Sequence, residues 1–252
     1  MSSRDACYQS GLRPYTDAKQ DMLHQLNTLV KSELVSLDKL LNRVLADDIR
    51  SPIDVPSFTN SAMDGYAFSG EGVKANAPLT LIGKSLAGQP FTGRVNAGEC
   101  VRIMTGAALP LGTDTVMMQE KCRVQDQQVH LEGDFTLGQN VRYPAEDLAQ
   151  GQRVFPAGTR VNARVLSVLS SLGLTELYVY RPLKVALLST GDELRSPGEI
   201  LRPGDIYDSN RIGLHAMLAR LGCTVIDYGI IKDDPELIKD AFLKAADEAD
   251  AI

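Results

Sequence analysis

The residues best suited to chemistry lie together in one short stretch, residues 60–67, which reads NSAMDGYA. Asn60, Ser61 and Asp64 supply amide, hydroxyl and carboxylate groups, and Gly65 follows directly. Because glycine adopts backbone angles that a side chain forbids, we expect Asp64 on a tight bend with its carboxylate facing a ligand or a cation. Asn, Ser, Asp and Gly are also the residues that turns prefer, so an ordinary turn before a strand is the alternative.

A hydroxyl and a glycine follow the predicted strand of residues 100–104. Thr105 and Gly106 come directly after this apolar run, which places both at a strand end. A strand that simply runs into a turn toward Pro110 explains the pattern equally well.

A third group of polar side chains lies in a loop bent by Pro144. Arg142, Glu146 and Asp147 bring one cation and two carboxylates together within six residues. By spacing alone, an exposed loop held by salt bridges is the simpler interpretation.

The C-terminal part of the chain has the clearest architecture. Residues 183–188 form an apolar run of the kind that is buried in a parallel sheet. Asp208 begins a predicted helix that ends at Gly222, residues 224–228 form the next strand, and Asp234 caps a third helix whose first position is Pro235. Strand, helix, strand and helix in this order predict a βαβα segment with a right-handed crossover.

Acidic and amide side chains gather at the predicted ligand-binding edge of this sheet. In open α/β sheets ligands bind outside the carboxyl ends of the strands. Carboxylates with few lysines suit Mg²⁺, which binds one or two carboxylates together with waters and substrate phosphates. Some of these residues are alternatively helix caps or solvated loop residues, above all Asp234 and Asp208. The residues at this edge are Asp192, Glu193, Asp208, Asn210, Asp233 and Asp234.

Apolar spacing predicts the elements that position these groups. Helices are expected after Asp17, after Ser36 and from Asn162 to Leu172, the last closed by Gly173 at its C-cap. The apolar positions of the first are Met22, Leu26, Leu29 and Val30, and those of the second are Leu37, Leu40, Leu41, Val44 and Leu45. Glycine and proline separate short strands at residues 79–82, 100–104, 115–118 and 121–124.

The chain therefore reads as a multidomain protein of mixed α/β and β-rich parts. Residues 1–52 and 138–181 are assigned to an elongated linking domain, residues 53–137 to a β-rich domain, and residues 182–252 to a three-layer α/β domain with a parallel sheet. Residues 249–252 lie where the next strand of that sheet is expected to begin, so we expect the α/β domain to be incomplete and the chain to be part of a longer one.

Composition limits the function classes. The 252 residues carry a net charge of −6, which argues against a broad basic surface for nucleic acid. No apolar run approaches the ~18 residues of a membrane span, and the N-terminus lacks the apolar core of a signal peptide. The four cysteines are scattered and there are three histidines, which favours a reduced, cytoplasmic protein without a thiolate or histidine metal site. No phosphate-binding glycine loop or catalytic triad is present.

Seven motifs, taken in order, resemble the MoeA-type molybdopterin molybdenumtransferases, the family that includes the gephyrin E domain. The resemblance runs from about residue 20 to the end of the chain. It rests on residues 51–56 (SPIDVP), 60–67 (NSAMDGYA), 102–107 (RIMTGA), 146–147 (ED), 155–159 (FPAGT), 189–194 (STGDEL) and 206–210 (IYDSN).

The resemblance implies the last step of molybdenum cofactor synthesis. Adenylylated molybdopterin is hydrolysed, molybdate is inserted at the dithiolene and AMP is released in an Mg²⁺-dependent reaction. The family forms a homodimer whose cleft lies between the β-rich domain of one subunit and the α/β domain of the other. The adenylyltransferase of the same pathway is an expected further partner.

The resemblance also implies roles for individual residues. The expected catalytic acids are Asp64, Asp147 and Glu193, and the expected Mg²⁺ ligands are Asp64, Glu193 and Asp233. The expected substrate-binding residues are Asn60, Ser61, Thr105, Gly106, Arg142, Asp192, Asp208 and Asn210.

The chain departs from the family pattern in two respects. The family continues beyond the point matched by residue 252 with further anion-binding loops and a small β domain, so we expect the 252 residues alone to insert no molybdate. The loop around Arg142 has fewer basic residues than the bacterial pattern. Two alternative functions stay open: a scaffold that binds partner proteins, as in gephyrin, and a nucleotide-binding α/β protein with another phosphorylated substrate.

Overall fold

The computed structural model describes residues 13–25, 31–73 and 77–252. The chain divides into two compact units. Unit 1 comprises residues 1–47 and 157–252, and unit 2 comprises residues 48–156. No helix in the described ranges is both long and apolar enough to cross a membrane.

Unit 2 is built on a six-stranded sheet with the strand order β8-β5-β7-β6-β10-β9. Neighbouring strands are antiparallel except for β6 and β7, which are parallel. Two short antiparallel pairs, β4 with β11 and β3 with β12, complete the unit. The strands are β3 (Ile49–Arg50), β4 (Asn60–Ser61), β5 (Gly65–Phe68), β6 (Pro78–Ser85), β7 (Glu99–Ile103), β8 (Thr115–Met118), β9 (Cys122–Gln125), β10 (Gln128–Leu131), β11 (Val141–Arg142) and β12 (Arg153–Phe155).

All four strands predicted in this region are present. Residues 79–82 lie within β6, and β8 has the expected bounds. The last one starts a residue later than expected because Lys121 ends a short 3-10 turn, η2 (Gln119–Lys121). Glycine, proline and alternating apolar residues were sufficient to predict these strands, because successive side chains of a strand point to opposite faces of the sheet.

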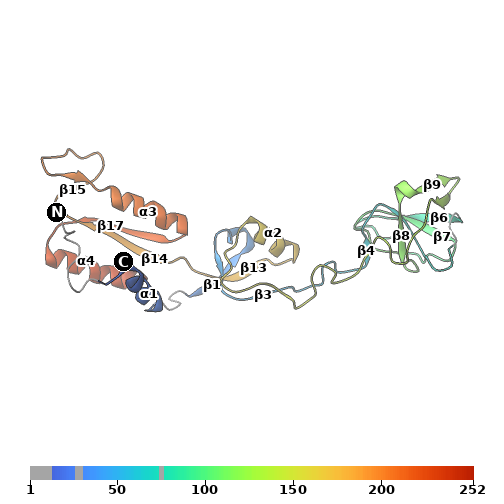
Figure 1. Ribbon diagram of the computed structural model, residues 1–252, viewed down its shortest axis with the longest axis horizontal. Coiled ribbons are helices and arrows are strands. Elements are labelled where there is room, and N and C mark those ends of the chain that lie inside the picture. The colour runs from blue at the N-terminus through green and yellow to red at the C-terminus, as the bar shows by residue number, and fades with distance from the viewer. Residues whose placement is uncertain (1–12, 26–30, 74–76) are drawn as a thin grey trace, which may run out of the picture. The chain divides into compact units, whose positions relative to one another are not determined.

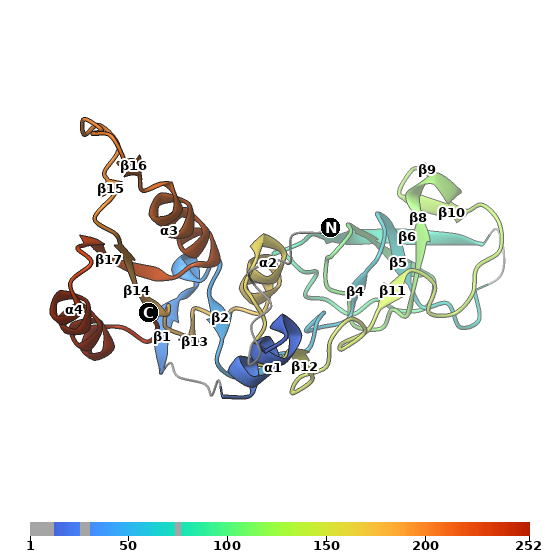
Figure 2. The same ribbon diagram turned by 60° about the vertical axis from the view of Figure 1, so that its left-hand side comes forward.

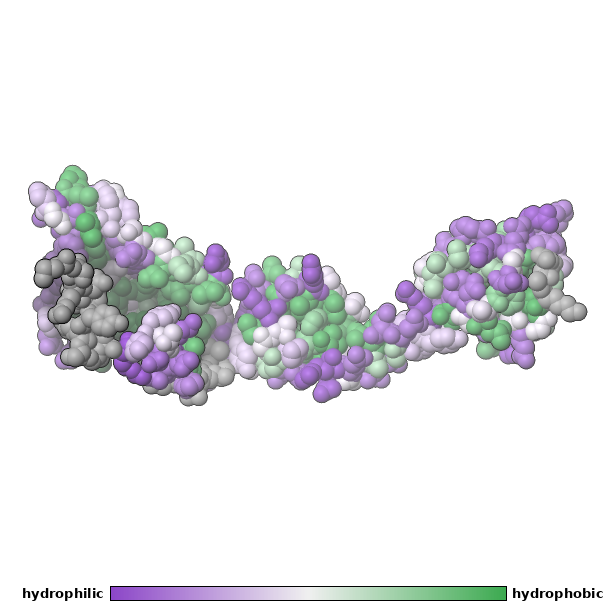
Figure 3. All heavy atoms as spheres, viewed as in Figure 1, coloured by the Kyte–Doolittle hydropathy of each residue, from purple (hydrophilic) through white to green (hydrophobic). Residues whose placement is uncertain are grey.

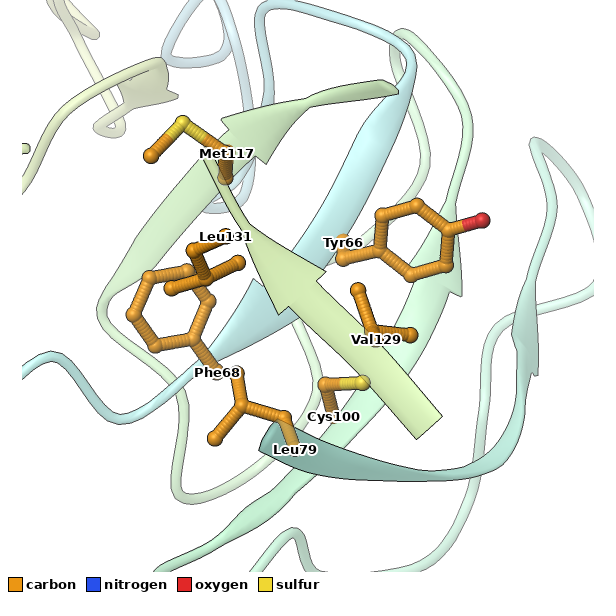
Figure 4. Packing of buried hydrophobic residues seen from close by; sticks show 7 residues of the cluster. All are labelled: Tyr66, Phe68, Leu79, Cys100, Met117, Val129 and Leu131. Carbon is orange, nitrogen blue, oxygen red and sulfur yellow. The ribbon is translucent and has the colours of Figure 1, made fainter. Parts of the chain in front are cut away.

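Strand β5 is buried on both faces. Tyr66 and Phe68 pack into one apolar cluster, and Ala67 packs into a second. Figure 4 shows the first cluster, in which the hydroxyl of Tyr66 points away from the other side chains. Its members are Tyr66, Phe68, Leu79, Cys100, Met117, Val129 and Leu131.

Glycine is required at position 65 because a side chain has no room there, and not because of its backbone angles. It lies in β5, and its φ is outside the left-handed range. A Cβ atom at this position would lie 2.0 Å from the carbonyl oxygen of Met117 on the neighbouring strand β8. The expectation that Gly65 supplies unusual angles for a bend is therefore wrong: the close approach of two strand backbones excludes a side chain.

The first part of unit 1 is a three-stranded antiparallel sheet with the order β1-β13-β2. Helix α2 (Ala163–Ser171) begins where expected, since the Asn162 side chain accepts hydrogen bonds from the amides of Arg164 and Val165. Leu172 is the C-cap, and Gly173 follows it with a φ of 74°. The strands are β1 (Ser32–Ser36), β2 (Val44–Leu45) and β13 (Glu176–Tyr180).

The helix predicted after Ser36 is wrong. Only the 3-10 turn η1 (Leu37–Lys39) forms there, between β1 and β2. Asn42 has a φ of 66°, which ends any helical path, and the amide of Leu45 bonds to the carbonyl of Thr159 instead. Leu40 and Leu45 are fully buried by this sheet while Leu41 stays 51% exposed. Leu40 and Leu45 are thus apolar because this sheet buries them, and not because they lie on one face of a helix.

The helix predicted after Asp17 is present as α1 (Tyr15–Gln25). Its predicted apolar positions Leu26, Leu29 and Val30 lie outside the described residues, and Met22 is exposed.

The second part of unit 1 has the predicted βαβα order. The parallel strands β14 (Lys184–Thr190) and β17 (Thr224–Ile231) lie between helix α3 (Ser209–Leu221) on one face and helix α4 (Pro235–Glu248) on the other (Figures 1 and 2). Ala251 forms one parallel bridge with Val185 beside β14. A short parallel pair, β15 (Leu194–Arg195) and β16 (Ile206–Tyr207), precedes α3.

The apolar residues of α3 are less buried than the helical spacing predicts. Leu214, Met217 and Leu221 are each about half exposed, and no residue of α3 is fully buried. Figure 3 shows apolar residues along this helix and on the adjoining loop between β15 and β16. The helix itself is present because its N-cap and its C-terminal Gly222, with a φ of 87°, fix both of its ends.

Candidate functional site

The residues predicted to form the site fall into two groups, one in each unit. Unit 2 contains Asn60, Ser61, Asp64, Thr105, Gly106, Arg142 and Asp147, and unit 1 contains Asp192, Glu193, Asp208, Asn210 and Asp233.

Asp64 and Thr105 meet at the ends of two paired strands. Asp64 immediately precedes β5 and Thr105 follows β7, and the antiparallel register places Gly65 opposite Ile103. Both the amide and the hydroxyl of Thr105 donate to Oδ1 of Asp64, at 2.7 and 2.6 Å. These hydrogen bonds, helped by the charge of Arg102, lower the pKa of Asp64 below that of an ordinary carboxyl group. The residue is therefore a carboxylate at neutral pH.

The two oxygens of the Asp64 carboxylate differ in their contacts. Among the described residues, none hydrogen-bonds to Oδ2 of Asp64, and the side chain is half-buried. Oδ1 is fully engaged, so Oδ2 is the atom that can accept from a ligand or bind a cation. The carboxylate is thus held in one orientation by Thr105; a role of Asp64 in binding a ligand or a cation stays a prediction.

Arg102 and Gln119 also contact residues around Asp64, and the sequence alone assigned neither of them a role. Arg102 donates to the hydroxyl of Tyr66 at 3.0 Å and to the side-chain oxygen of Gln119, and its guanidinium lies 5.0 Å from the centre of the Tyr66 ring. The amide of Gln119 donates to the carbonyl of Asp64 at 3.0 Å. Arg102 belongs to the motif at residues 102–107. No sequence pattern around Gln119 indicates a role, because only the pairing of β5 with β8 brings it close to Asp64.

Asn60 and Ser61 shape the backbone of the site. Both side chains are buried; the Asn60 amide donates to the carbonyl of Phe58 at 3.2 Å, and the Ser61 hydroxyl donates to the carbonyl of Met63 at 2.6 Å. The carbonyl of Ser61 accepts from the amide of Gly106 at 2.8 Å. These contacts join the segment before Asp64 to the segment after Thr105.

Position 106 requires glycine because of its backbone conformation. Its φ is 78°, and a Cβ atom there would meet no atom within 4 Å. Since side chains rarely adopt this φ, glycine lets the chain turn directly after Thr105 while leaving open space beside it.

Arg142 and Asp147 are exposed in unit 2. Arg142 belongs to β11, opposite Asn60 of β4. The amide of Asp147 donates to the carbonyl of Val55 at 2.9 Å, which fixes the loop backbone while the carboxylate faces solvent. Across the ranges that the structure describes, neither residue forms a salt bridge. A loop held by salt bridges, the alternative suggested by spacing, is therefore not what forms there.

In unit 1 the carboxyl ends of β14 and β17 bring three acids to one edge, as expected. Asp192 and Glu193 follow β14, and Asp233 follows β17. The amide of Asp233 donates to Oδ1 of Asp192 at 3.4 Å, and the amide of Gly191 donates to the carbonyl of Ile231 at 3.2 Å. All three carboxylates are exposed.

Asp208 is the N-cap of α3 and is buried, with 3% of its surface exposed. It accepts from the amide of Arg211 at 3.1 Å and from its guanidinium at 2.9 Å, and Arg211 also pairs with Asp227 of β17 at 2.5 Å. Burial opposes ionisation of Asp208, but its hydrogen bonds to Arg211 and Ser189 and the charge of Arg211 together outweigh burial and lower the pKa of Asp208. Asp234 likewise caps α4. The helix-cap alternative thus describes both, whereas Asn210 is exposed in the first turn of α3.

The oxygen atoms of these side chains are ligands of the kind that Mg²⁺ prefers. In the described part of the chain, no group of three or more His, Cys, Asp or Glu residues could hold a metal by itself. Asp64 belongs to unit 2, whereas Glu193 and Asp233 belong to unit 1. Because Mg²⁺ commonly binds one or two carboxylates plus waters and phosphates, the free oxygen of Asp64 suits it.

Comparison with known proteins gives matches over almost the whole chain. Residues 13–173 match the family described as MoeA N-terminal region (domain I and II), and residues 186–252 match a probable molybdopterin binding domain.

Several curated proteins and solved structures are similar. A molybdopterin molybdenumtransferase of Haemophilus influenzae is 42% identical over 241 residues, covering 93% of this chain and 58% of that protein. A protein of the same name from Nostoc is 35% identical over 237 residues, covering 92% of this chain and 54% of its own length. The crystal structure of a molybdopterin biosynthesis MoeA protein from Pyrococcus horikoshii OT3 matches with a TM-score of 0.90 at 31% identity, over 95% of this chain and 65% of that one.

The chain thus spans little more than half the length of these two curated relatives. The family match alone covers well over half of the chain, in the region that carries Asp64 and Thr105. On this basis the chain belongs to the MoeA family.

Proposed function

We propose that this chain supplies part of a molybdopterin molybdenumtransferase, which inserts molybdate into adenylylated molybdopterin and releases AMP. The observation that carries the proposal is the Asp64 carboxylate, ionised and oriented by Thr105 with Oδ2 free. The relatives from Haemophilus and Nostoc are named molybdopterin molybdenumtransferases, which supports the transfer of molybdenum to molybdopterin.

Asp64 acts in this proposal as a fixed negative charge. A carboxyl group whose pKa is lowered stays ionised through the neutral range and is a weak proton donor. Oδ2 of Asp64 would hold Mg²⁺ together with the substrate's phosphate oxygens. When bound, the ion would neutralise the charge that develops as the phosphate linkage to AMP breaks. Thr105 keeps the carboxylate from rotating, so the site is organised before the substrate arrives.

The acids of unit 1 supply the second half of the proposed site. Asp192, Glu193 and Asp233 lie at the carboxyl ends of parallel strands, where ligands of open α/β sheets bind. In the homodimer that we propose, the β-rich domain of one subunit and the α/β domain of the other form the cleft, with the elongated linking domain between the two. Glu193 and Asp233 would complete the Mg²⁺ site, Asp147 and Arg142 would line it, and the enzyme would work in the cytoplasm.

A chimaeric enzyme tests the proposal. Residues 1–252 would replace the matching part of the Haemophilus influenzae relative, and AMP release from adenylylated molybdopterin would be measured with molybdate and Mg²⁺. We expect turnover that needs both ions, and none from the 252 residues alone. A chimaera that is folded, binds the substrate and yet releases no AMP, or a chain of 252 residues that turns over alone, would contradict the account.

A further inference from the structure

Arg195 lies in unit 1, at the end of β15 and shortly after the acids Asp192 and Glu193. Its guanidinium turns back onto the backbone that carries them. Nη1 donates to the carbonyl of Asp192 at 2.8 Å and to the carbonyl of Leu194 at 2.7 Å. The two carbonyls on either side of Glu193 are therefore bonded to one nitrogen of one side chain.

Asp205 fixes the other side of this guanidinium. Nη2 of Arg195 lies 2.9 Å from Oδ1 of Asp205, and only 27% and 9% of the two side chains are exposed. The second oxygen of Asp205 accepts from the amide of Arg202 at 2.9 Å, and the amide of Asp205 donates to the carbonyl of Arg202 at 2.9 Å. Because the donors of a guanidinium form a rigid planar fork, Asp205 sets the direction in which Nη1 points.

Every backbone carbonyl from Gly191 to Arg195 accepts a hydrogen bond. Two of them bond to the Arg195 guanidinium, and the others accept from backbone amides at 2.9 to 3.3 Å. A segment whose carbonyls are all engaged has little freedom to rotate, and Arg195 is the side chain that supplies two of these bonds. The carbonyls that accept from amides are those of Gly191 (from Leu194), Glu193 (from Ile206) and Arg195 (from Asp208).

The Glu193 carboxylate lies over Gly191. A Cβ atom at position 191 would lie 2.7 and 2.9 Å from the two carboxylate oxygens of Glu193, and Gly191 has a φ of 149°, which side chains rarely adopt. Glycine thus leaves the space that the carboxylate occupies. The place of the carboxylate depends on the backbone between these two residues, which includes the Asp192 carbonyl that Arg195 holds.

We propose that Arg195 is a positioning residue that holds the Glu193 carboxylate at the carboxyl edge of the sheet of β14 and β17. Asp205 orients the guanidinium, and the guanidinium fixes the backbone on both sides of Glu193. The proposal rests on the proposed function, in which Glu193 binds Mg²⁺. Residues that orient a metal ligand raise metal affinity, because the ligand is ordered before the ion binds.

The alternative is that the pair of Arg195 and Asp205 only closes the loop between β15 and β16. Figures 1 and 2 show this loop extending away from β14 and β17. In that case, loss of the pair should loosen residues 196–205 and leave the backbone around Glu193 unchanged. The two roles therefore differ in what happens before residue 195.

The first test is amide hydrogen exchange, followed by NMR in the isotope-labelled 252-residue chain. In Arg195→Met, the amides of Leu194 and Ile206 should exchange about tenfold faster, because they donate to the carbonyls of Gly191 and Glu193. Exchange in the central parts of β14 and β17 should stay unchanged, which would show that the loss is local.

Arg202→Met is the matched control. It removes the same charge from the same loop, but Arg202 contacts Asp205 through its backbone, which the substitution keeps. If Arg195→Met accelerates exchange at Leu194 no more than Arg202→Met does, Arg195 does not hold this segment and the proposal is wrong.

The second test uses the chimaeric enzyme. Arg195→Met should raise the Mg²⁺ concentration needed for half-maximal AMP release about tenfold or more, with little change in KM for adenylylated molybdopterin at saturating Mg²⁺. Asp205→Asn keeps an acceptor but removes the charge, so it should shift the Mg²⁺ dependence less and in the same direction. An unchanged Mg²⁺ dependence in Arg195→Met would overturn the proposal. If Arg195→Met does not fold, an unchanged dependence in Asp205→Asn would do so.

The two tests separate this proposal from the proposed function. If the chimaera releases AMP and the folded Arg195→Met variant keeps the original Mg²⁺ dependence, the positioning role fails while the transferase stands. If the unsubstituted chimaera is folded, binds the substrate and releases no AMP, the proposed function fails. Faster exchange at Leu194 in Arg195→Met would then still support the hold of Arg195 on the Glu193 segment.

Discussion

Thr105 holds Asp64 by two hydrogen bonds that end on the same carboxylate oxygen, Oδ1, at 2.7 Å from the amide and 2.6 Å from the hydroxyl. The two residues are 41 positions apart and meet because β5 and β7 are paired. Thr105 occupies Oδ1, and among the described residues none hydrogen-bonds to Oδ2, so Oδ2 can accept from a ligand. This relationship converts a loop aspartate into an oriented, ionised group.

The Thr105 hydroxyl should control the acidity of Asp64. Thr105→Val removes the hydroxyl donor but keeps the amide, so the pKa of Asp64 should rise toward the ordinary carboxyl value. Thr105→Ser keeps both donors and should leave the pKa lowered. A carboxyl-detected NMR titration measures it directly. Equal pKa values in the two variants would show that the hydroxyl has no such role.

Gly65→Ala should destabilise unit 2, because its Cβ would lie 2.0 Å from the carbonyl oxygen of Met117. The backbone of a central strand cannot move cheaply, and overpacking of this kind costs about 1–3 kcal/mol. Gly93→Ala is the matched control, since its Cβ would meet only the side-chain ring of Phe91, at 2.8 Å. Urea unfolding should show a larger loss for Gly65→Ala. Equal losses would mean that the strands can separate.

Arg211 should stabilise unit 1 through the buried carboxylate of Asp208. Arg211→Met leaves that carboxylate buried without its cation, which is expected to cost about 3 kcal/mol, the lower end of the range for a broken buried pair. Lys239→Met is the control, because the Lys239–Glu236 pair is exposed and should change stability by less than about 1 kcal/mol.

The effect of Arg211 should depend on pH in a defined direction. The folded-state pKa of Asp208 is lowered, so its stabilising contribution is complete above the unfolded carboxyl pKa of about 4 and is lost as the pH falls through the lower folded value. The stability difference between wild type and Arg211→Met should therefore be largest near neutral pH and shrink in acid. A difference that grows in acid would contradict this pairing.

The thiols of Cys100 and Cys122 should resist alkylation in the folded protein. Burial raises the pKa of Cys100 to about 12 and that of Cys122 to about 11, and the thiolate is the reactive form. Iodoacetamide at pH 8, followed by mass spectrometry, should modify both only in urea. Modification of native Cys100 at the rate of the unfolded chain would place it outside the core.

Local signals were sufficient to predict the elements whose ends carry their own chemistry. Asn162, Asp208 and Asp234 each cap the helix that was expected to follow, because a cap needs only amides two or three residues away. The order of strands and helices in residues 184–248 could therefore be predicted from one sequence.

Contacts between distant segments could not be predicted in this way. Leu40 and Leu45 have helical spacing, yet a sheet buries them, since periodicity does not encode strand partners. Gln119 reaches Asp64 only through the pairing of β5 and β8. Gly65 was recognised as a required glycine, but the reason, the carbonyl of Met117, lies on another strand.

The measurement that tests the central claim most directly is AMP release by the chimaeric enzyme carrying Asp64→Asn. Asparagine keeps the size of the side chain and an acceptor for Thr105 but removes the charge. Substitution of a residue that supports a metal ligand, as Thr105 would, typically lowers activity about 10–100-fold. We predict that Asp64→Asn lowers the rate of AMP release more than Thr105→Val does, while the chimaera stays folded. A folded Asp64→Asn chimaera that releases AMP at the unsubstituted rate would contradict the assignment of Asp64 to the site.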